Sequence, residues 1–202
     1  MRLSSNGYSR GTRRIPLVAA LLLASRPVAA ETLDDLLARG ELTLLETKPD
    51  GRLRQVTAMG LVRAPIDVVW AKLTNLAAYE TWMPQVADST VVSTAGNVVV
   101  ADFSIAVVGP NVNFRQKLTL DPTTHTIQAE WVSGALGGSR WSWQLEARDG
   151  ATLVRRMLYT NVVDTNWIVR AVESEHHTME YGINVATGVV ELRGLKTALG
   201  VP

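Results

Sequence analysis

His176, His177 and Glu180 lie close together in the sequence, at a spacing that suits a metal ion. His176 and Glu180 are four residues apart, so on a helix they would share one face and could ligate the same ion. Two such ligands on a charged helix do not make a metal site, and we interpret the group as a solvated helix face. The third histidine, His125, lies in a predicted turn without an evident partner. We therefore expect no metal site.

Other arrangements that support catalysis are missing from the sequence. There is no cysteine, which excludes thiol chemistry and disulfides. No serine has the flanking glycines of a nucleophile elbow, and Gly134, Gly137 and Gly138 match neither a dinucleotide-binding nor a phosphate-binding loop. Glu130 and Asp102 could form an acid–base pair, but alternation puts both on the outer side of their predicted strands. We therefore expect no catalytic set and no cofactor.

The last predicted strand, over residues 151–160, offers an arginine to one face of the sheet. Its two alternating sets are Leu153, Arg155, Met157 and Tyr159 on one face and Val154, Arg156, Leu158 and Thr160 on the other. Either assignment places an arginine on the inner face. We assign the first set to it, because Met157 and Tyr159 suit the wall of a pocket, and Arg155 could then bind a carbonyl or acidic group of a ligand. The alternative is an arginine at the strand end whose charge reaches water.

Aromatic side chains gather on the same inner face of the preceding strands. Together with residues of the last strand and the C-terminal helix, they form the predicted ligand-binding set: Phe103, Phe114, Trp131, Trp141, Trp143, Arg155, Met157, Tyr159, Trp167, Met179 and Ile183. Large, rigid rings suit an apolar ligand with a few polar groups. The alternative is that these rings only fill the hydrophobic core.

Strand-like segments separated by short turns position these residues. The predicted strands cover 42–46, 53–62, 98–108, 112–120, 126–133, 140–148 and 151–160, with a further segment at 86–93. Turn sequences such as Pro49-Asp50-Gly51 and Asp149-Gly150 separate them, and short turns join antiparallel neighbours. The first two strands should pair as a hairpin.

Helical spacing is predicted on both sides of these strands. The helices are a short one near 33–39 capped by Thr32, one from Pro65 with Ile66, Val69, Trp70 and Leu73 on its buried face, a short one capped by Asn75, and a long one over about 165–198. The apolar face of the long helix carries Ile168, Val172, Met179, Ile183, Ala186 and Val190. Gly182 and Gly188 should each weaken this helix by about 1 kcal/mol. Because one helix, about 10 Å across, cannot fill a strongly bent sheet, this α+β layout predicts a cavity.

Residues 1–30 have the features of a cleavable signal peptide. They contain five arginines and no acidic residue, an apolar run from Ile15 to Ala24, and small residues before a predicted cut after Ala30. Residues 31–202 then form one domain with 15 basic and 19 acidic residues. This domain lacks the excess of positive charge that nucleic-acid binding would require. No later apolar run is long enough to span a membrane. We expect a periplasmic or secreted protein with at most transient membrane contact; an uncleaved anchor is the alternative.

The sequence resembles the opening of a START-related, Bet v 1-like (SRPBCC) domain at Leu61-Val62-Arg63-Ala64-Pro65-Ile66-Asp67-Val68-Val69-Trp70 and at Trp82-Met83-Pro84. The branch it resembles is the coenzyme Q-binding and polyketide cyclase/dehydrase group, over about residues 50 to 198. The resemblance implies a helix-grip fold, in which a sheet of about seven strands wraps around a long helix and encloses a hydrophobic cavity. Members bind lipids, isoprenoid quinones, sterols or polyketides, mostly without metal or nucleotide.

Three functions are compatible with these features, in decreasing order of support. The first is an exported, non-enzymatic carrier or sensor of a hydrophobic small molecule. The second is an envelope interaction module that uses the fold without a ligand. The third is a cyclase- or dehydrase-like enzyme on a polyketide-type substrate, with Arg155 and Tyr159 steering the reacting chain.

Overall fold

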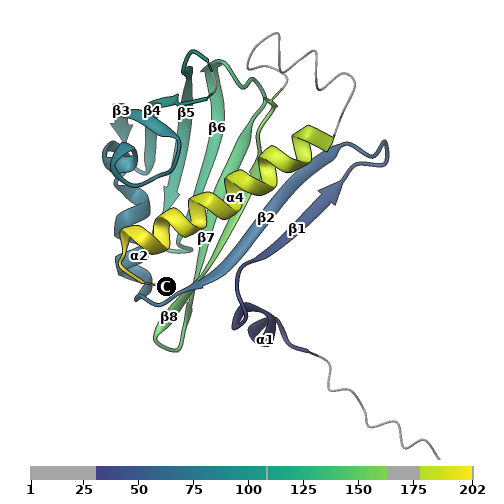
Figure 1. Cartoon of the computed structure of the whole chain (residues 1–202). Coiled ribbons are helices and arrows are strands. Elements are labelled where there is room, and N and C mark those ends of the chain that lie inside the picture. Colours follow the sequence, from purple (N-terminus) through teal and green to yellow (C-terminus); the bar gives the residue numbers. More distant parts are fainter. Residues whose placement is uncertain (1–30, 108, 163–177, 202) are drawn as a thin grey trace, which may run out of the picture. The chain divides into compact units, whose positions relative to one another are not determined.

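A computed structural model of the chain describes residues 31–107, 109–162 and 178–201 (Figure 1). The predicted signal peptide, Trp167, His176 and His177 lie outside the described residues. The elements are α1 (Leu33–Leu37), β1 (Leu42–Thr47), β2 (Leu53–Val62), α2 (Ile66–Thr74), the 3-10 helix η1 (Leu76–Thr81), β3 (Val86–Ala95), β4 (Val98–Ile105), β5 (Val112–Asp121), β6 (Thr126–Gly134), β7 (Arg140–Arg148), β8 (Ala151–Tyr159) and α4 (Thr178–Ala198).

The strands form a curved antiparallel sheet in the order β1-β2-β8-β7-β6-β5-β4-β3, and α4 crosses it (Figure 1). The predicted hairpin of β1 and β2 is confirmed, with Leu42 opposite Met59. Every predicted strand forms, so the described sheet has eight strands where the family resemblance implied about seven. The α+β helix-grip fold is confirmed.

The helix α4 lies close to the sheet, and to the segment before β3, because glycines leave room for it. A Cβ atom on Gly188 would meet Leu158 Cδ2 at 3.0 Å and Ala58 Cβ at 3.2 Å, and one on Gly194 would meet Pro84 Cδ at 2.5 Å. Gly188, which the sequence analysis treated only as a weak point of the helix, is therefore a contact point with β2 and β8.

The predicted apolar face of α4 is only partly correct: Met179 and Ile183 are partly buried, two other members are exposed, and Ile168 and Val172 lie outside the described residues. The residues that the sheet buries are Glu180, Asn184, Gly188, Leu192 and Leu195, whereas Ala186 and Val190 are exposed. Glu180, which was expected on a solvated face, is only 6% exposed. This polar part of the helix can be buried because both atoms of the Asn184 amide have partners. Asn184 accepts a hydrogen bond from Thr160 N (2.7 Å) and donates to Thr160 O (3.2 Å) and Glu180 O (2.9 Å).

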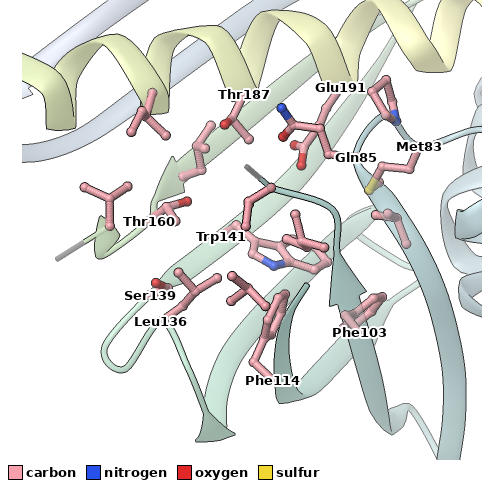
Figure 2. Close-up of a pocket in the computed structure, with 18 of the residues that line it drawn as sticks. Met83, Gln85, Phe103, Phe114, Leu136, Ser139, Trp141, Thr160, Thr187 and Glu191 are labelled. Atoms are coloured by element: carbon pink, nitrogen blue, oxygen red, sulfur yellow. The ribbon is translucent and has the colours of Figure 1, made fainter. Parts of the chain in front are cut away.

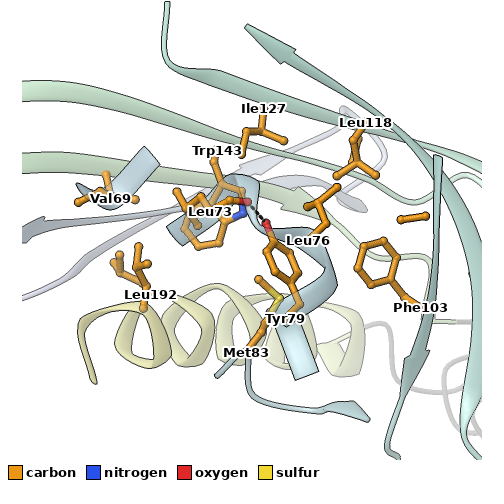
Figure 3. Packing of buried hydrophobic residues seen from close by; sticks show 14 of the residues in the cluster. Val69, Leu73, Leu76, Tyr79, Met83, Phe103, Leu118, Ile127, Trp143 and Leu192 are labelled. Atoms are coloured by element: carbon orange, nitrogen blue, oxygen red, sulfur yellow. Dashed lines mark hydrogen bonds between the residues drawn. The ribbon is translucent and has the colours of Figure 1, made fainter. Parts of the chain in front are cut away.

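The helices α2 and η1 close one end of the main hydrophobic core (Figure 3). Val69 and Leu73 of α2 are fully buried, as predicted, and Tyr79 of η1 donates a hydrogen bond to Leu73 O (2.6 Å). Asn75 precedes η1 but makes no side-chain capping hydrogen bond, so its predicted role is wrong. His125, for which no partner was foreseen, packs edge-on against Trp70 with ring centres 5.4 Å apart.

The short helix α1 packs on the opposite face of β2 and β8. Thr32 caps it as predicted, since the Thr32 hydroxyl and the Asp35 carboxylate form a reciprocal capping box. Its residue Leu37 contacts a small cluster that contains Met59 and Leu153. Apolar residues of β8 are therefore covered on both faces of the sheet.

Candidate ligand-binding cavity

A cavity of about 320 Å³ lies between α4 and the concave face of the sheet (Figure 2). The segment from Tyr79 to Val86 borders one side, and residues of β4, β5, β7 and β8 form the wall opposite the helix. Met179, Ile183, Thr187 and Glu191 of α4 complete the lining at a regular spacing of four, which keeps them on one face of the helix. The cavity is thus built from elements far apart in the sequence.

The wall formed by β4 and β5 is aromatic. Phe103 and Phe114 are cross-strand partners, and their rings stack with centres 5.7 Å apart. Tyr79 approaches Phe103 with ring centres 6.1 Å apart. Burial raises the pKa of the Tyr79 hydroxyl, which keeps it neutral. This part of the lining therefore suits an uncharged, apolar group of a ligand.

Arg156 of β8 is the basic residue among the described lining residues. Its side chain is 3% exposed, and Nε donates to Glu191 Oε2 at 2.6 Å. The guanidinium carbon lies 4.3 Å from the ring centre of Trp141 and 4.6 Å from that of Trp143. The Nη1 atom is buried and has no hydrogen-bond partner among the described residues. A flat, oriented cation thus lies among the lining residues, with one buried donor that has no partner among the described residues.

A second polar contact holds Trp141 in place. The Trp141 indole N–H donates to Gln116 Oε1 at 2.7 Å, and Gln116 is only 2% exposed. Both residues line the cavity. Because the amide oxygen of Gln116 already has this donor, the contact orients the indole ring that packs against Arg156.

Polar groups fix the end of the cavity where β8 leaves the sheet. Ser139 Oγ accepts a hydrogen bond from Asn161 N (2.8 Å), and Asn161 Nδ2 donates to Gly137 O (2.7 Å). Asn184 joins α4 to the same stretch through Thr160. These bonds attach the connection between β6 and β7, the end of β8 and α4 to one another.

The structure brings five of the predicted ligand-binding residues together around the cavity. Phe103, Phe114, Trp141, Met179 and Ile183 line the cavity. Trp143 is fully buried in the core and touches the Arg156 guanidinium from below the lining. Trp167 lies outside the described residues.

Trp131 is not among the described residues that line the cavity. It lies one residue beyond Glu130, the last residue of β6 that pairs with β7. The indole is 37% exposed, and its N–H donates to Ala135 O at 3.0 Å. The strands β6 and β7 separate at this point, so strand alternation alone predicted the wrong surroundings for Trp131.

The predicted inner face of the last strand is also wrong. Arg156, Leu158 and Thr160 line the cavity, and Arg155, Met157 and Tyr159 do not. Arg155 pairs with Glu146 at 2.9 Å on the other face. The set with Leu153 resembled an inner face because α1 covers that side.

Tyr159 lies outside the cavity, in a polar setting. Burial, followed by a hydrogen bond and the charge of Glu180, raises its pKa to about 12. The Arg140 guanidinium carbon lies 5.0 Å from the centre of its ring. Tyr159 is therefore a neutral hydroxyl that supports the start of α4.

The turn between β7 and β8 carried a signal that the sequence analysis missed. The two-residue turn Asp149-Gly150 places Arg148 opposite Ala151, and the same register places Trp143 opposite Arg156. Directly opposed residues share a face of the sheet. Once Trp143 is taken as inward, Arg156 must also point inward.

Two further features of the described residues concern metal ligands and membrane-spanning helices. The described residues contain no cluster of three or more potential metal ligands. Within the same residues, no helix combines the length and apolar character needed to cross a membrane.

Comparison with solved structures supports the fold. A STAR-related lipid transfer protein from Xanthomonas axonopodis has a TM-score of 0.63 at 17% identity, covering 80% of this chain and 94% of its own. The Zhui aromatase/cyclase from Streptomyces has a TM-score of 0.60 at 17% identity, with coverages of 73% and 93%. A Thermus thermophilus protein has the same score and identity, with coverages of 71% and 94%. At these identities the likeness concerns the fold alone.

Comparison of sequences gives the family. No curated protein sequence matches the chain significantly. The model of the family described as polyketide cyclase / dehydrase and lipid transport matches residues 62–178, more than half of the chain. The chain belongs to the polyketide cyclase/dehydrase and lipid transport family and has its START/Bet v 1-like fold.

Proposed function

We propose that this protein is an exported, non-enzymatic carrier or sensor that holds one hydrophobic small molecule in the cavity beneath α4. The observation that carries the proposal is the cavity itself. Protein interiors are normally packed to the density of organic crystals, yet about 320 Å³ is left open beside Phe103, Phe114 and Trp141. An apolar ligand would restore the contacts that these wall atoms lack.

The alternative of an interaction module without a ligand would be favoured by a smaller space. Ligand pockets usually have volumes of about 300 to 1,000 Å³, and this cavity lies at the lower end of that range. Its size therefore supports a compact ligand, with a few fused rings or a short chain, over no ligand.

The enzymatic alternative loses the residues on which it was based. Arg155 and Tyr159, the residues expected to steer a polyketide chain, do not line the cavity. The arginine that does, Arg156, is engaged by Glu191. A carrier role needs only the apolar wall and the anchoring donor that the described residues provide.

The test uses N-phenylnaphthylamine, a neutral dye whose fluorescence rises in apolar surroundings. We expect saturable binding by the wild-type protein and loss of binding in Ile183→Trp, because the larger side chain would occupy the cavity. Ala186→Trp is the matched control, since Ala186 is exposed on the same helix and should leave dye binding unchanged. Equal binding by both variants would exclude the cavity as the site, and no binding by the wild type would argue against the proposal.

The exported location rests on the composition of residues 1–30. Expression of the full chain in its own host, followed by N-terminal sequencing, should find a mature protein that begins at Glu31. A protein that keeps Met1 and stays in the cytosolic fraction would contradict export without affecting the ligand proposal.

A further inference from the structure

The charged groups at the cavity wall neutralise each other. Among the described lining residues, Arg156 and Glu191 are the charged ones, and their side chains are 3% and 12% exposed. The Nε–Oε2 distance of 2.6 Å makes them a close, charge-assisted pair. The cavity therefore presents polar atoms without presenting a net charge.

The pair leaves one hydrogen-bonding group unused. Arg156 Nη1 is buried and has no acceptor among the described residues. The guanidinium cannot easily turn away, because Nε is held by Glu191 and the flat group packs against Trp141 and Trp143. Arg156 lines the cavity, and buried donors in folded proteins nearly always have an acceptor, so an oxygen atom of a ligand whose binding uncovers Nη1 is the natural partner.

The charge of that oxygen follows from Glu191. A carboxylate ligand placed at Nη1 would bring a second negative charge close to Glu191, in surroundings of low dielectric where repulsion is strong. A carbonyl oxygen accepts the same hydrogen bond without this repulsion. A hydrocarbon fits the apolar wall but leaves Nη1 without a partner.

We propose that the cavity selects a neutral hydrophobic molecule with a carbonyl oxygen, which accepts a hydrogen bond from Arg156 Nη1. This inference rests on the proposed function and adds the chemical class of the ligand. It predicts discrimination against both the hydrocarbon and the carboxylate of the same shape.

The test compares three naphthalenes substituted at the same ring carbon: methyl naphthyl ketone, isopropylnaphthalene and naphthoate. They share size and shape and differ in the oxygen and the charge. Affinities are measured by displacement of N-phenylnaphthylamine. We expect the ketone to bind about tenfold more tightly than the hydrocarbon, as a hydrogen bond from a charged donor would give, and naphthoate to bind most weakly.

Three variants assign the discrimination to the pair. Arg156→Met should abolish the preference for the ketone over the hydrocarbon. Arg155→Met is the matched control, because Arg155 immediately precedes Arg156 in β8 and lies on the opposite face, where it pairs with Glu146. Glu191→Gln keeps an acceptor for Arg156 Nε but removes the negative charge, so naphthoate should gain at least about tenfold in affinity.

The outcomes separate this inference from the proposed function. Wild-type binding of naphthoate as tight as that of the ketone, or equal binding of ketone and hydrocarbon, would overturn the neutral-carbonyl inference and leave apolar binding intact. Failure of all three probes and of the dye would overturn the proposed function itself. If Arg156→Met fails to fold, as circular dichroism would show, the response of Glu191→Gln to naphthoate still decides the question.

Discussion

Replacement of Gly194 by alanine should destabilise the protein, whereas the same replacement at Gly182 should stabilise it. Both glycines lie in α4. A Cβ atom on Gly182 would meet nothing within 4 Å. On Gly194 it would lie 2.5 Å from Pro84 Cδ, 2.9 Å from Pro84 Cγ and 3.2 Å from Trp82 O. A proline ring and a main-chain oxygen cannot move aside as a flexible side chain can.

The magnitudes follow from two opposing terms. Alanine is better than glycine in a helix by about 1 kcal/mol. Forcing an extra carbon into a packed contact costs up to about 3 kcal/mol. Gly182→Ala should therefore raise the free energy of unfolding by about 1 kcal/mol, and Gly194→Ala should lower it by about 2 kcal/mol. At roughly 3 °C per kcal/mol for a chain of this size, the Tm values should differ by about 9 °C.

Thermal unfolding followed by circular dichroism at one pH and protein concentration measures this difference. Gly188→Ala should fall between the two variants, since its Cβ contacts are 3.0 and 3.2 Å and one of them is with the end of the Leu158 side chain. If Gly194→Ala raises Tm as much as Gly182→Ala does, α4 does not lie against Pro84, and the boundary of the cavity would have to be redrawn.

Two further predictions concern the attachment of α4 to the rest of the domain. Burial opposes ionisation of Glu41, but the hydrogen bond and charge of Lys196, with a contribution from Arg193, outweigh it and lower the pKa of the carboxyl. This contribution to stability is present above the unfolded pKa of about 4.5 and is lost as the pH falls through the folded value. The Tm deficit of Glu41→Gln relative to wild type should therefore be full at pH 7 and shrink in acid; a deficit independent of pH would contradict this. Asn184→Leu removes the hydrogen bonds to Thr160 and Glu180 and should cost about 3 kcal/mol in urea unfolding, and a cost below about 0.5 kcal/mol, the size of an ordinary surface change, would refute that role.

The order of strands and turns could be predicted because it depends on neighbouring residues. Alternation along each strand, the capping box at Thr32 and turns such as Asp149-Gly150 involve residues a few positions apart. The register of a two-residue turn reaches further, since it places Trp143 opposite Arg156. The position of the anchoring arginine was therefore available in the sequence, although our own prediction chose Arg155.

The environment of each face could not be predicted, because it depends on contacts between distant segments. The helix α1 covers Leu153 on the outer face of β8. That face therefore carries apolar residues, as an inner face would. The end of pairing at Glu130 leaves Trp131 partly in solvent.

The sequence by itself determined the elements, their antiparallel order and the aromatic character of one side of the sheet. Only the tertiary structure decided that Glu191, 35 residues after Arg156, meets it at the cavity wall. It also decided that Gly188 brings α4 close to the sheet and that Gly194 brings it close to Pro84. Helical spacing reports which residues share a face, but not which face a distant strand will cover. In α4 that face carries a glutamate, an asparagine and a glycine before its two leucines, and the burial of these first three residues depends on partners that a pattern of apolar residues does not contain.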